Sequence, residues 1–502
     1  MLLADIVATS NVVAATRSRK AKVAALADAL RAAEPAELET VVSYLAGSLR
    51  QRRTGLGGRG LTDLPQPAAE PSLTVGEVHE AFDALAEIAG AGSQATRRTA
   101  VTALFARATA PEQTWLRGLV TGDVRQGALD ALVQESVAQV AGVPLTAVRR
   151  SAMLSGSTLA AAVAAFQGGE AALAEIGLEV GRPVLPMLAS SAPDIVAAMA
   201  KAVKDGPVVI DAKLDGIRIQ AHRRGGEILL VTRSLDDITA RLPEVVEVVR
   251  ALPGGDLVLD GEALMLGPDG RPRPFQETAS RTAQSTGAAV VPYFFDVLHL
   301  DGTDLLEAPG HERMAALDDL VPAQHRVTRL LTDDAEAAAD FVAATLADGH
   351  EGVIVKDPDA PYDAGRRGSA WVKVKPVHTL DLVVLAVERG SGRRQGLLSN
   401  IHLGARDPES GGFVMLGKTF KGMTDEMLAW QTQRFTELMT DDNGWAVTVR
   451  PEQVVEIAVD GVQRSSRYPG GVALRFARVV RYRDDKTAAE ADTLDTVRAF
   501  LT

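Results

Sequence analysis

The chain contains no cysteine among its 502 residues. This absence excludes disulfide bonds, thiol catalysis and any zinc site built on cysteine ligands. No apolar run approaches the roughly 20 residues that a membrane-spanning helix needs, and no internal repeat or low-complexity tail is evident. The segment from Met1 to Asp5 lacks the basic and apolar regions of a secretory signal. We therefore expect a cytoplasmic protein without a membrane segment.

Acidic residues outnumber basic residues. The chain has 53 Lys and Arg residues and 65 Asp and Glu residues, which gives a net charge of −12 at pH 7. This sum argues mildly against general nucleic-acid binding, although a basic patch can exist on an acidic protein. Hydrophobic residues make up 46% and charged residues 24% of the chain, which is ordinary for a folded protein. Since 502 residues exceed what one core holds, we expect about three domains.

Residues 1–180 have the composition and periodicity of a helical domain. They are rich in Ala, Leu, Val and Glu, with apolar residues at helical spacing in 22–30 and 128–133. A segment rich in glycine and proline, 54–71, separates two groups of helices.

Basic side chains cluster in two places of this helical region. Residues 17–22 contain four of them without an acid, and residues 97–125 contain five against Glu112 and Asp123. Either cluster alone is typical of a solvated helix face, whereas several clusters in one helical domain favour phosphate contacts. The basic residues are Arg17, Arg19, Lys20, Lys22, Arg97, Arg98, Arg107, Arg117 and Arg125.

The composition changes near 182–188, where two prolines indicate the entry to a second domain. Short apolar runs of strand type follow, and helical segments at 311–320 and 334–347 lie among them. This mixture predicts a domain of α/β or α+β type. The predicted strands are 208–210, 228–232, 257–259, 291–295 and 353–355.

A third region follows Pro376 and opens with the apolar run 380–387. Short strands and glycine turns dominate it, and one helix is predicted near 424–438. Roughly 125 residues of this kind suit a small β-barrel of the OB type.

Lys213 ends the apolar run that begins at Val209, and Asp215, Gly216 and Arg218 follow it. A lysine at the mouth of a buried strand is poorly hydrated, which lowers its pKa and leaves a nucleophilic neutral amine. The other interpretation is a lysine that caps the strand and pairs with Asp215.

Other polar residues also lie at strand ends in the second region. Glu262 follows one predicted strand, and Glu351 precedes another. Lys373 and Lys375 alternate with valines, so both lysines point to the same face of a strand. Basic and acidic groups that converge in this way suit an anion together with a metal ion. Alternatively, the two lysines form the solvated face of a half-exposed strand.

Taken in order, these elements resemble the covalent nucleotidyltransferase superfamily, and within it the ATP-dependent DNA ligases. The pattern Lys-x-Asp-Gly-x-Arg begins at Lys213, and the later family elements follow in the same order with similar spacing. They are Thr232-Arg233, Asp260-Gly261-Glu262, Phe294-Phe295-Asp296, Leu300-Asp301-Gly302, Glu351 to Lys356, Arg366-Arg367-Gly368, Trp371 to Lys375, Arg475 to Arg481 and Asp484-Asp485-Lys486.

The resemblance implies a multidomain protein: an all-α DNA-binding domain at 1–180, an α+β nucleotidyltransferase (adenylation) domain at 183–376 and a C-terminal OB-fold β-barrel at 377–502. It implies a monomer that seals nicked double-stranded DNA with ATP and Mg²⁺. In this chemistry Lys213 takes AMP from ATP, AMP passes to the 5′-phosphate at the nick, and the 3′-hydroxyl then displaces AMP. Cations must surround the phosphoryl group, because charge builds on it in each step.

The same resemblance implies roles for the remaining candidate residues. Lys373 and Lys375 would hold the α-phosphate, and Glu262 and Glu351 would support Mg²⁺. Phe295 would stack on the adenine. The other predicted contacts are Arg218, Arg233 and Arg367 to the ribose and phosphates, Arg475 and Arg478 to the leaving pyrophosphate, and Arg97, Arg98 and Arg125 to DNA.

One position departs from the family pattern. The acid two residues before the lysine is often glutamate, and here it is Asp211. The shorter side chain puts in doubt how the amino group of adenine is recognised, although the backbone could still read it.

Three alternatives use the same residues differently. An RNA ligase or an mRNA-capping guanylyltransferase would share the nucleotidyl-lysine chemistry, but the basic helical domain favours an enzyme of duplex DNA. A scaffold without catalysis is disfavoured because Lys213, Glu262 and Glu351 are all present. An NAD-dependent ligase is disfavoured because that family carries a four-cysteine zinc module, and this chain has no cysteine.

Overall fold

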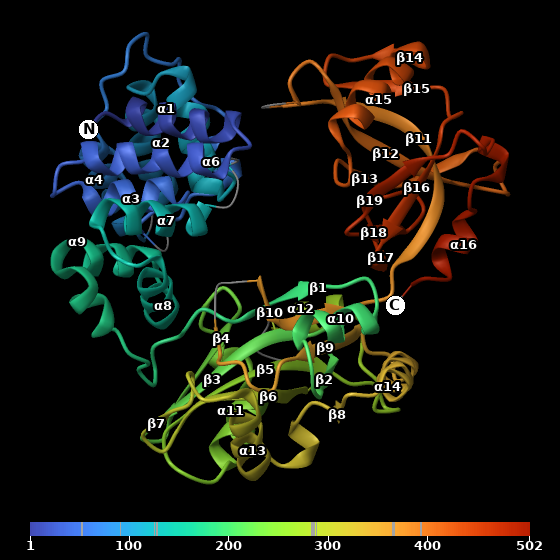
Figure 1. Ribbon diagram of the computed structural model, residues 1–502. Helices are drawn as coiled ribbons and strands as arrows, with labels where there is room; N and C mark the ends of the chain where they lie inside the picture. The colour runs from blue at the N-terminus through green and yellow to red at the C-terminus, as the bar shows by residue number, and fades with distance from the viewer. Residues whose placement is uncertain are drawn as a thin grey trace.

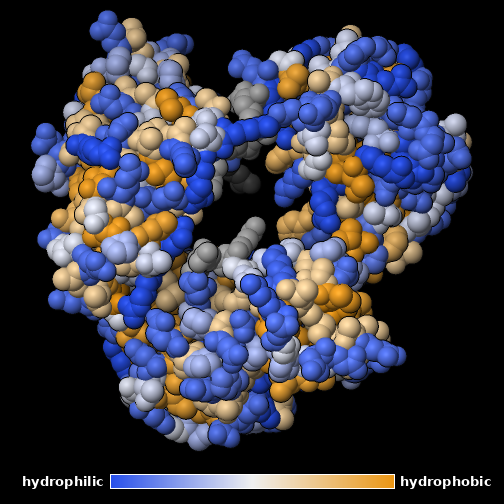
Figure 2. Space-filling model, in the orientation of Figure 1, coloured by the Kyte–Doolittle hydropathy of each residue, from blue (hydrophilic) through white to orange (hydrophobic). Residues whose placement is uncertain are grey.

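The structure is a computed structural model that describes residues 1–51, 54–90, 92–124, 126, 129–282, 287, 289–363, 367–391 and 394–501. The chain forms a helical N-terminal part, a middle part with two sheets and a C-terminal part made mostly of strands (Figure 1). These three parts surround a central opening, which the space-filling view shows directly (Figure 2).

The N-terminal part is helical, as the sequence predicts. Polar side chains begin several of its helices: the hydroxyl of Ser18 accepts from the backbone of Ala21, and Thr74 and Glu77 cap each other's backbone. The interior holds large buried side chains such as Tyr44 and Phe82. The helices are α1 (Leu3–Ala15), α2 (Arg19–Ala32), α3 (Leu38–Leu45), α4 (Val75–Glu87), α5 (Ser93–Ala106), α6 (Ala110–Thr121), α7 (Leu129–Ala141), α8 (Leu145–Ser155) and α9 (Thr158–Ala174).

The end of α8 attaches the helical part to the middle part. Leu154 is fully buried and belongs to one apolar cluster with Val184 of the following linker. The backbone NH of Leu185 donates to the carbonyl of Met153 over 3.0 Å. A Cβ atom at Gly156 would lie 2.8 Å from the carbonyl oxygen of Pro183, so the linker approaches this turn closely. The two parts therefore share an apolar contact.

The middle part contains two sheets, and the runs predicted as strands lie within them. One sheet has the strand order β1-β10-β9-β2-β8, and the other has the order β4-β3-β5-β6-β7. The first sheet consists of β1 (Leu188–Ser191), β2 (Val208–Lys213), β8 (Arg329–Thr332), β9 (Gly352–Lys356) and β10 (Arg367–Val374). The second consists of β3 (Ile217–Arg224), β4 (Glu227–Thr232), β5 (Leu257–Met265), β6 (Val290–Leu300) and β7 (Thr303–Asp304).

Helices accompany both sheets of the middle part, and the structure confirms those predicted near 311–320 and 334–347. Apolar side chains of α10 and α14 pack against strands of the first sheet, and those of α11 and α13 pack against the second. The helices are α10 (Ile195–Ala202), α11 (Pro243–Ala251), α12 (Phe275–Thr282), α13 (Gly310–Leu320) and α14 (Ala335–Ala347).

The chain crosses from one sheet to the other directly after Lys213. β2 belongs to the first sheet and β3 to the second, with a short turn between them. Gly216 lies in this turn, where a Cβ atom would come within 2.4 Å of the carbonyl oxygen of Ala263 and 3.0 Å of Glu262 Cγ. Only glycine therefore lets the turn lie so close to β5.

The C-terminal part is a strand domain with one long helix, α15 (Asp425–Glu437), which confirms the helix predicted near 424–438. Its main sheet has the order β13-β12-β11-β15-β14, and β16 pairs with both β11 and β19. Among the described residues the pairing does not close into a barrel, so the OB fold stays a prediction. The strands are β11 (His378–Arg389), β12 (Leu398–Arg406), β13 (Phe413–Thr419), β14 (Met439–Asp442), β15 (Ala446–Val449), β16 (Val454–Val459), β17 (Gly461–Arg464), β18 (Val472–Arg475) and β19 (Arg478–Tyr482), and a short helix α16 (Leu494–Arg498) follows.

The predicted domain boundaries near 180 and 376 lie in the segments between α9 and β1 and between β10 and β11. They stay predictions. In the part of the chain that the structure describes, no helix combines the length and the apolar character needed to cross a membrane.

Candidate active site

Lys213 lies at the end of β2 and lines a cavity of about 1610 Å³ between the two sheets of the middle part. Burial lowers the pKa of its amine, and the carboxylates of Glu262 and Asp215 act in the opposite direction. The burial that the strand pattern predicts is therefore present. A lysine in this state gives up its proton more readily than an exposed one.

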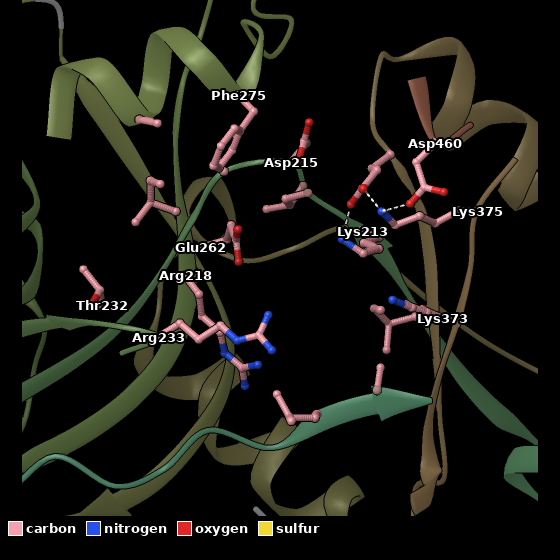
Figure 3. Close-up of a pocket in the computed structure, with 18 of the residues that line it drawn as sticks. Lys213, Asp215, Arg218, Thr232, Arg233, Glu262, Phe275, Lys373, Lys375 and Asp460 are labelled. Carbon is pink, nitrogen blue, oxygen red and sulfur yellow. Dashed lines mark hydrogen bonds and ion pairs between the residues drawn. The ribbon is translucent and has the colours of Figure 1, made fainter. Parts of the chain in front are cut away.

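Glu351 lies between two lysines at the start of β9. One carboxylate oxygen accepts from Lys213 and the other from Lys375 (Figure 3). The backbone NH of Glu351 also donates to the carbonyl of Lys213 over 3.0 Å, which aligns the two residues. Burial and the charge of Lys213 lower the pKa of Lys375. The three side chains thus form one connected group in which a proton can move from an amine to a carboxylate.

Glu262 of β5 lies opposite Arg218 of β3 in the second sheet. Burial raises the pKa of its carboxyl group to about 7, although the charges of Lys213 and Arg218 lower it. At neutral pH this carboxyl group is therefore close to the point at which it ionises. A cation that enters the cavity would stabilise the ionised form.

Arg218 is held by fixed partners on several sides. Its guanidinium donates to both carboxylate oxygens of Asp260 over 3.0 and 2.6 Å and to the carbonyl of Met187 over 2.7 Å. The hydroxyl of Tyr362 donates to the same Asp260 over 2.6 Å. The guanidinium also lies 5.5 Å from the ring centre of Phe295. These contacts give Arg218 one fixed orientation at the cavity wall.

Asp211, the residue that departs from the family pattern, is buried and paired with two cations. Its carboxylate lies 3.2 Å from Arg329 Nε and 2.6 Å from Lys356 Nζ. Lys356 Nζ in turn lies 5.1 Å from the ring centre of Phe295 and 4.5 Å from that of Trp371. Asp211 therefore orients a lysine toward the aromatic end of the cavity, where Phe295 was predicted to stack on adenine.

The C-terminal part contributes side chains to the other end of the cavity. Arg475 donates to the carboxylate oxygens of Asp215 over 2.9 and 3.4 Å. Arg478 donates to Asp460 over 3.2 Å, and Asp460 lies 3.6 Å from Lys375 Nζ. The predicted C-terminal arginines therefore reach the same cavity as the predicted nucleophile.

The sequence predicts a set of residues that bind the nucleotide and the metal. Those whose side chains the structure describes all line this cavity. Arg367 lies in β10, and its side chain is outside the described residues. The residues that line the cavity are Asp211, Lys213, Arg218, Arg233, Glu262, Phe295, Glu351, Lys373, Lys375, Arg475 and Arg478.

The residues predicted to bind DNA lie elsewhere, in the helical part. Arg98 is exposed on α5. Arg97 is half-buried, and its guanidinium donates to the carbonyl of Ile88 over 2.7 Å and lies against Gly55. Arg125 is outside the described residues. DNA binding by these three arginines stays a prediction.

Sequence reasoning assigned no role to several residues that line the cavity, among them Lys356, Trp371, Phe275 and Asp460. Asp460 had a detectable signal, because it follows the strand β16 and precedes Gly461, just as Asp260 precedes Gly261. Phe275 lies outside every pattern used for the prediction. Only the structure places its ring 5.7 Å from the guanidinium of Arg475.

The site has the donor chemistry that Mg²⁺ requires. Mg²⁺ prefers oxygen ligands and binds through one or two carboxylates together with waters and substrate phosphates. Glu262 and Glu351 line one cavity, and the pKa of Glu262 near 7 fits a carboxylate that ionises fully beside a cation. Among the described residues no cluster of three or more acids or histidines forms a closed cage. The residues thus fit an ion that arrives with a nucleotide.

A buried lysine beside converging cations and carboxylates, in a cavity large enough for a nucleotide, is typical of enzymes that carry a nucleotide on a lysine. Family models agree with this class. The ATP dependent DNA ligase domain matches residues 186–375, the ATP dependent DNA ligase C terminal region matches 394–486, and the DNA ligase N terminus matches 62–138.

Similar proteins extend the match to the whole chain. A protein of a Nocardioides species named "Probable DNA ligase" is 69% identical over 506 residues, covering 100% of this chain and 99% of the relative. One of the same name from Kineococcus radiotolerans is 68% identical, with 100% of each chain covered. A solved structure named Pmar-Lig_PreS3 has a TM-score of 0.63 at 18% identity, covering 95% of this chain and 99% of the other, and supports the fold. The chain belongs to the ATP-dependent DNA ligase family.

Proposed function

We propose that this enzyme seals nicks in duplex DNA and that Lys213 is its nucleophile. The observation that carries the proposal is the group Lys213, Glu351 and Lys375, which lies in one cavity that the arginines of the C-terminal part also reach. Membership of the family supports ATP as the nucleotide donor.

In the first step, the neutral amine of Lys213 attacks the α-phosphorus of ATP. A P–N bond forms, the bond to the bridging oxygen breaks, and pyrophosphate leaves. Glu351, which accepts a hydrogen bond from Lys213, takes the proton that the amine loses. Lys375, Lys373 and the C-terminal arginines offset the negative charge on the phosphates.

In the second step, a 5′-phosphate oxygen at the nick attacks the phosphorus of lysyl-AMP, the P–N bond breaks, and Lys213 leaves as an amine with the proton returned from Glu351. In the third step, the 3′-hydroxyl oxygen attacks the 5′-phosphorus while its proton passes to water, and AMP leaves as the phosphodiester forms. Mg²⁺ held by Glu262 and Glu351 would neutralise phosphate charge when bound.

The same proposal covers the surroundings of the site. We infer that duplex DNA occupies the central opening of a monomer and that exposed arginines of the helical part, such as Arg98, bind its phosphates (Figure 2). We also propose that the C-terminal strands form an OB-type fold and that the enzyme works in the cytoplasm, where its DNA substrate lies.

The direct test uses ATP labelled at the α-phosphate. With Mg²⁺ the protein should acquire the label covalently and release pyrophosphate, and the Lys213→Ala variant should not become labelled, because it lacks the amine. A variant that labelled like the unmodified protein would show that another residue is the nucleophile.

The substrate is tested with a labelled nicked duplex. We expect sealing with ATP and none with NAD, and slower sealing when the nick lies in RNA. Preference for an RNA nick would favour an RNA ligase, and labelling with GTP in place of ATP would favour a capping-type enzyme.

A further inference from the structure

Asp460 belongs to the C-terminal part and yet lines the active-site cavity. It lies between β16 and β17, and its backbone NH donates to the carbonyl of Arg475 over 3.0 Å. This bond ties Asp460 to the strand that carries Arg475. Figure 3 shows its carboxylate beside the amine of Lys375.

The carboxylate of Asp460 bridges two parts of the protein. One oxygen lies 3.2 Å from Arg478 Nη1 in its own part, and the other lies 3.6 Å from Lys375 Nζ in the middle part. Asp460 therefore connects a residue predicted to hold the α-phosphate with a residue predicted to orient the pyrophosphate.

The convergence of cations explains why an acid is needed at this position. Arg475 and Arg478 of the C-terminal part line the same cavity as Lys375, and like charges repel at short range in a cavity of low dielectric. The carboxylate of Asp460 offsets this repulsion, as Asp215 does for Arg475 across the same interface. Without these acids, closure before a nucleotide binds would place unbalanced positive charge in the cavity.

The interface around Asp460 is polar. The core cluster of the C-terminal part consists only of residues from that part, whereas α8 of the helical part shares an apolar cluster with the middle part. Another contact across the interface is a hydrogen bond from Gln276 Nε2 to the carbonyl of Arg464 over 3.3 Å. Among the described residues, this arrangement therefore depends on a few polar contacts and on the ring of Phe275 against Arg475, and each of them should affect its stability.

We propose that Asp460 is a positioning residue for the transfer of AMP to Lys213. It seats the C-terminal part on Lys375 and directs Arg478 toward the pyrophosphate end of ATP. This inference rests on Lys213 as the nucleophile. Its effect is confined to the first step, because pyrophosphate leaves only there.

The test separates the steps of the reaction. The Asp460→Asn variant keeps the shape of the side chain and removes its charge. In single-turnover labelling with ATP, we expect its maximal rate to fall by about tenfold or more, with a smaller change in the ATP concentration at half-saturation. The Asp460→Glu variant should recover most of the rate. Sealing of a nick that already carries AMP on its 5′-phosphate should stay within about twofold of the unmodified enzyme.

A control variant and three contrary outcomes decide whether Asp460 acts as proposed. Asp441→Asn removes an exposed acid of the same part, away from the cavity, and should leave every step unchanged. Unchanged labelling by Asp460→Asn would overturn the proposal, and so would equal slowing of both steps. Faster labelling would also overturn it, since Asp460 would then compete with ATP for the cations. The Lys213→Ala variant, measured beside these, shows separately whether the nucleophile is correct.

A second measurement follows closure itself. Because the chain has no cysteine, cysteines introduced at the exposed residues Asp205 and Glu409 can carry a pair of fluorescent labels without background. We expect Asp460→Asn to shift the nucleotide-free protein toward longer separations between the labels, and Asp441→Asn to leave the distribution unchanged. An unaltered distribution in Asp460→Asn would show that Asp460 does not seat the C-terminal part.

Discussion

At the scale of single residues, the cavity around Lys213 contains groups whose pKa values burial has moved toward each other. Burial lowers the pKa of Lys213 and raises that of Glu262 to about 7. Both shifts favour the uncharged forms, so these two groups carry less charge than their residue types suggest. Phosphates and a cation bound in the cavity would favour the charged forms, which would couple binding to the protonation of these groups.

Glu262 gives a prediction for stability against pH. Its pKa is about 7 in the folded protein against an ordinary 4.5, so the folded state binds more protons between these values, and stability falls as pH rises through this window. The Glu262→Gln variant should gain about 1–3 kcal/mol in free energy of unfolding at pH 8 and nothing below pH of about 4. Denaturant titrations at both pH values measure the difference. A loss of stability at pH 8 would contradict the raised pKa.

At the scale of elements, the turn between β2 and β3 decides where Lys213 lies. The turn joins the two sheets of the middle part and passes so close to β5 that Gly216 has no room for a side chain. The pairing of β2 with its neighbouring strands fixes the backbone before Lys213. The close approach of Gly216 to β5 fixes the backbone after it. Strands position such a group more rigidly than a loop does.

Gly216→Ala tests this placement. A Cβ atom 2.4 Å from the carbonyl oxygen of Ala263 must push the turn away from β5. We expect a loss of about 2–4 kcal/mol in the free energy of unfolding and a fall of about 100-fold in lysine labelling. Gly57→Ala is the control, because no atom lies within 4 Å of its added Cβ. Normal labelling by Gly216→Ala would mean that the turn can move without displacing Lys213.

At the scale of the whole molecule, the three parts surround the central opening and are joined to each other unequally (Figure 2). The helical and middle parts share buried apolar side chains at the end of α8, whereas the described contacts of the C-terminal part with the middle part are ion pairs, a hydrogen bond and the ring of Phe275 against Arg475. Arg17 pairs with Asp425 where the helical and C-terminal parts meet, and both side chains are exposed. Exposed ion pairs contribute little stability. This ion pair therefore does little to hold the helical and C-terminal parts together.

The salt dependence of DNA binding tests the role of the helical part. If Arg98 and Arg117, both exposed, bind phosphates, their joint replacement by alanine should reduce the slope of log affinity against log salt by about 2. Titration of a fluorescent nicked duplex at several salt concentrations gives the slope. Replacing the exposed Arg31 and Arg271 together is the matched control. If the two double variants have the same slope, Arg98 and Arg117 are ordinary solvated surface residues that do not bind phosphate.

The sequence by itself determined the family, because the nucleotidyltransferase elements are short and follow one another in a fixed order. It also named residues that the structure brings into one cavity, and their roles stay predictions. It also determined the helices at 311–320 and 334–347, whose apolar periodicity is local. The tertiary structure decided that Asp211 pairs with Lys356 and that Asp460 lies beside Lys375. Their partners lie on strands distant in sequence, and no local pattern records which carboxylate meets which cation. Whether the C-terminal strands close into a barrel also depends on pairing between segments distant in sequence, and the periodicity along one segment does not specify that pairing.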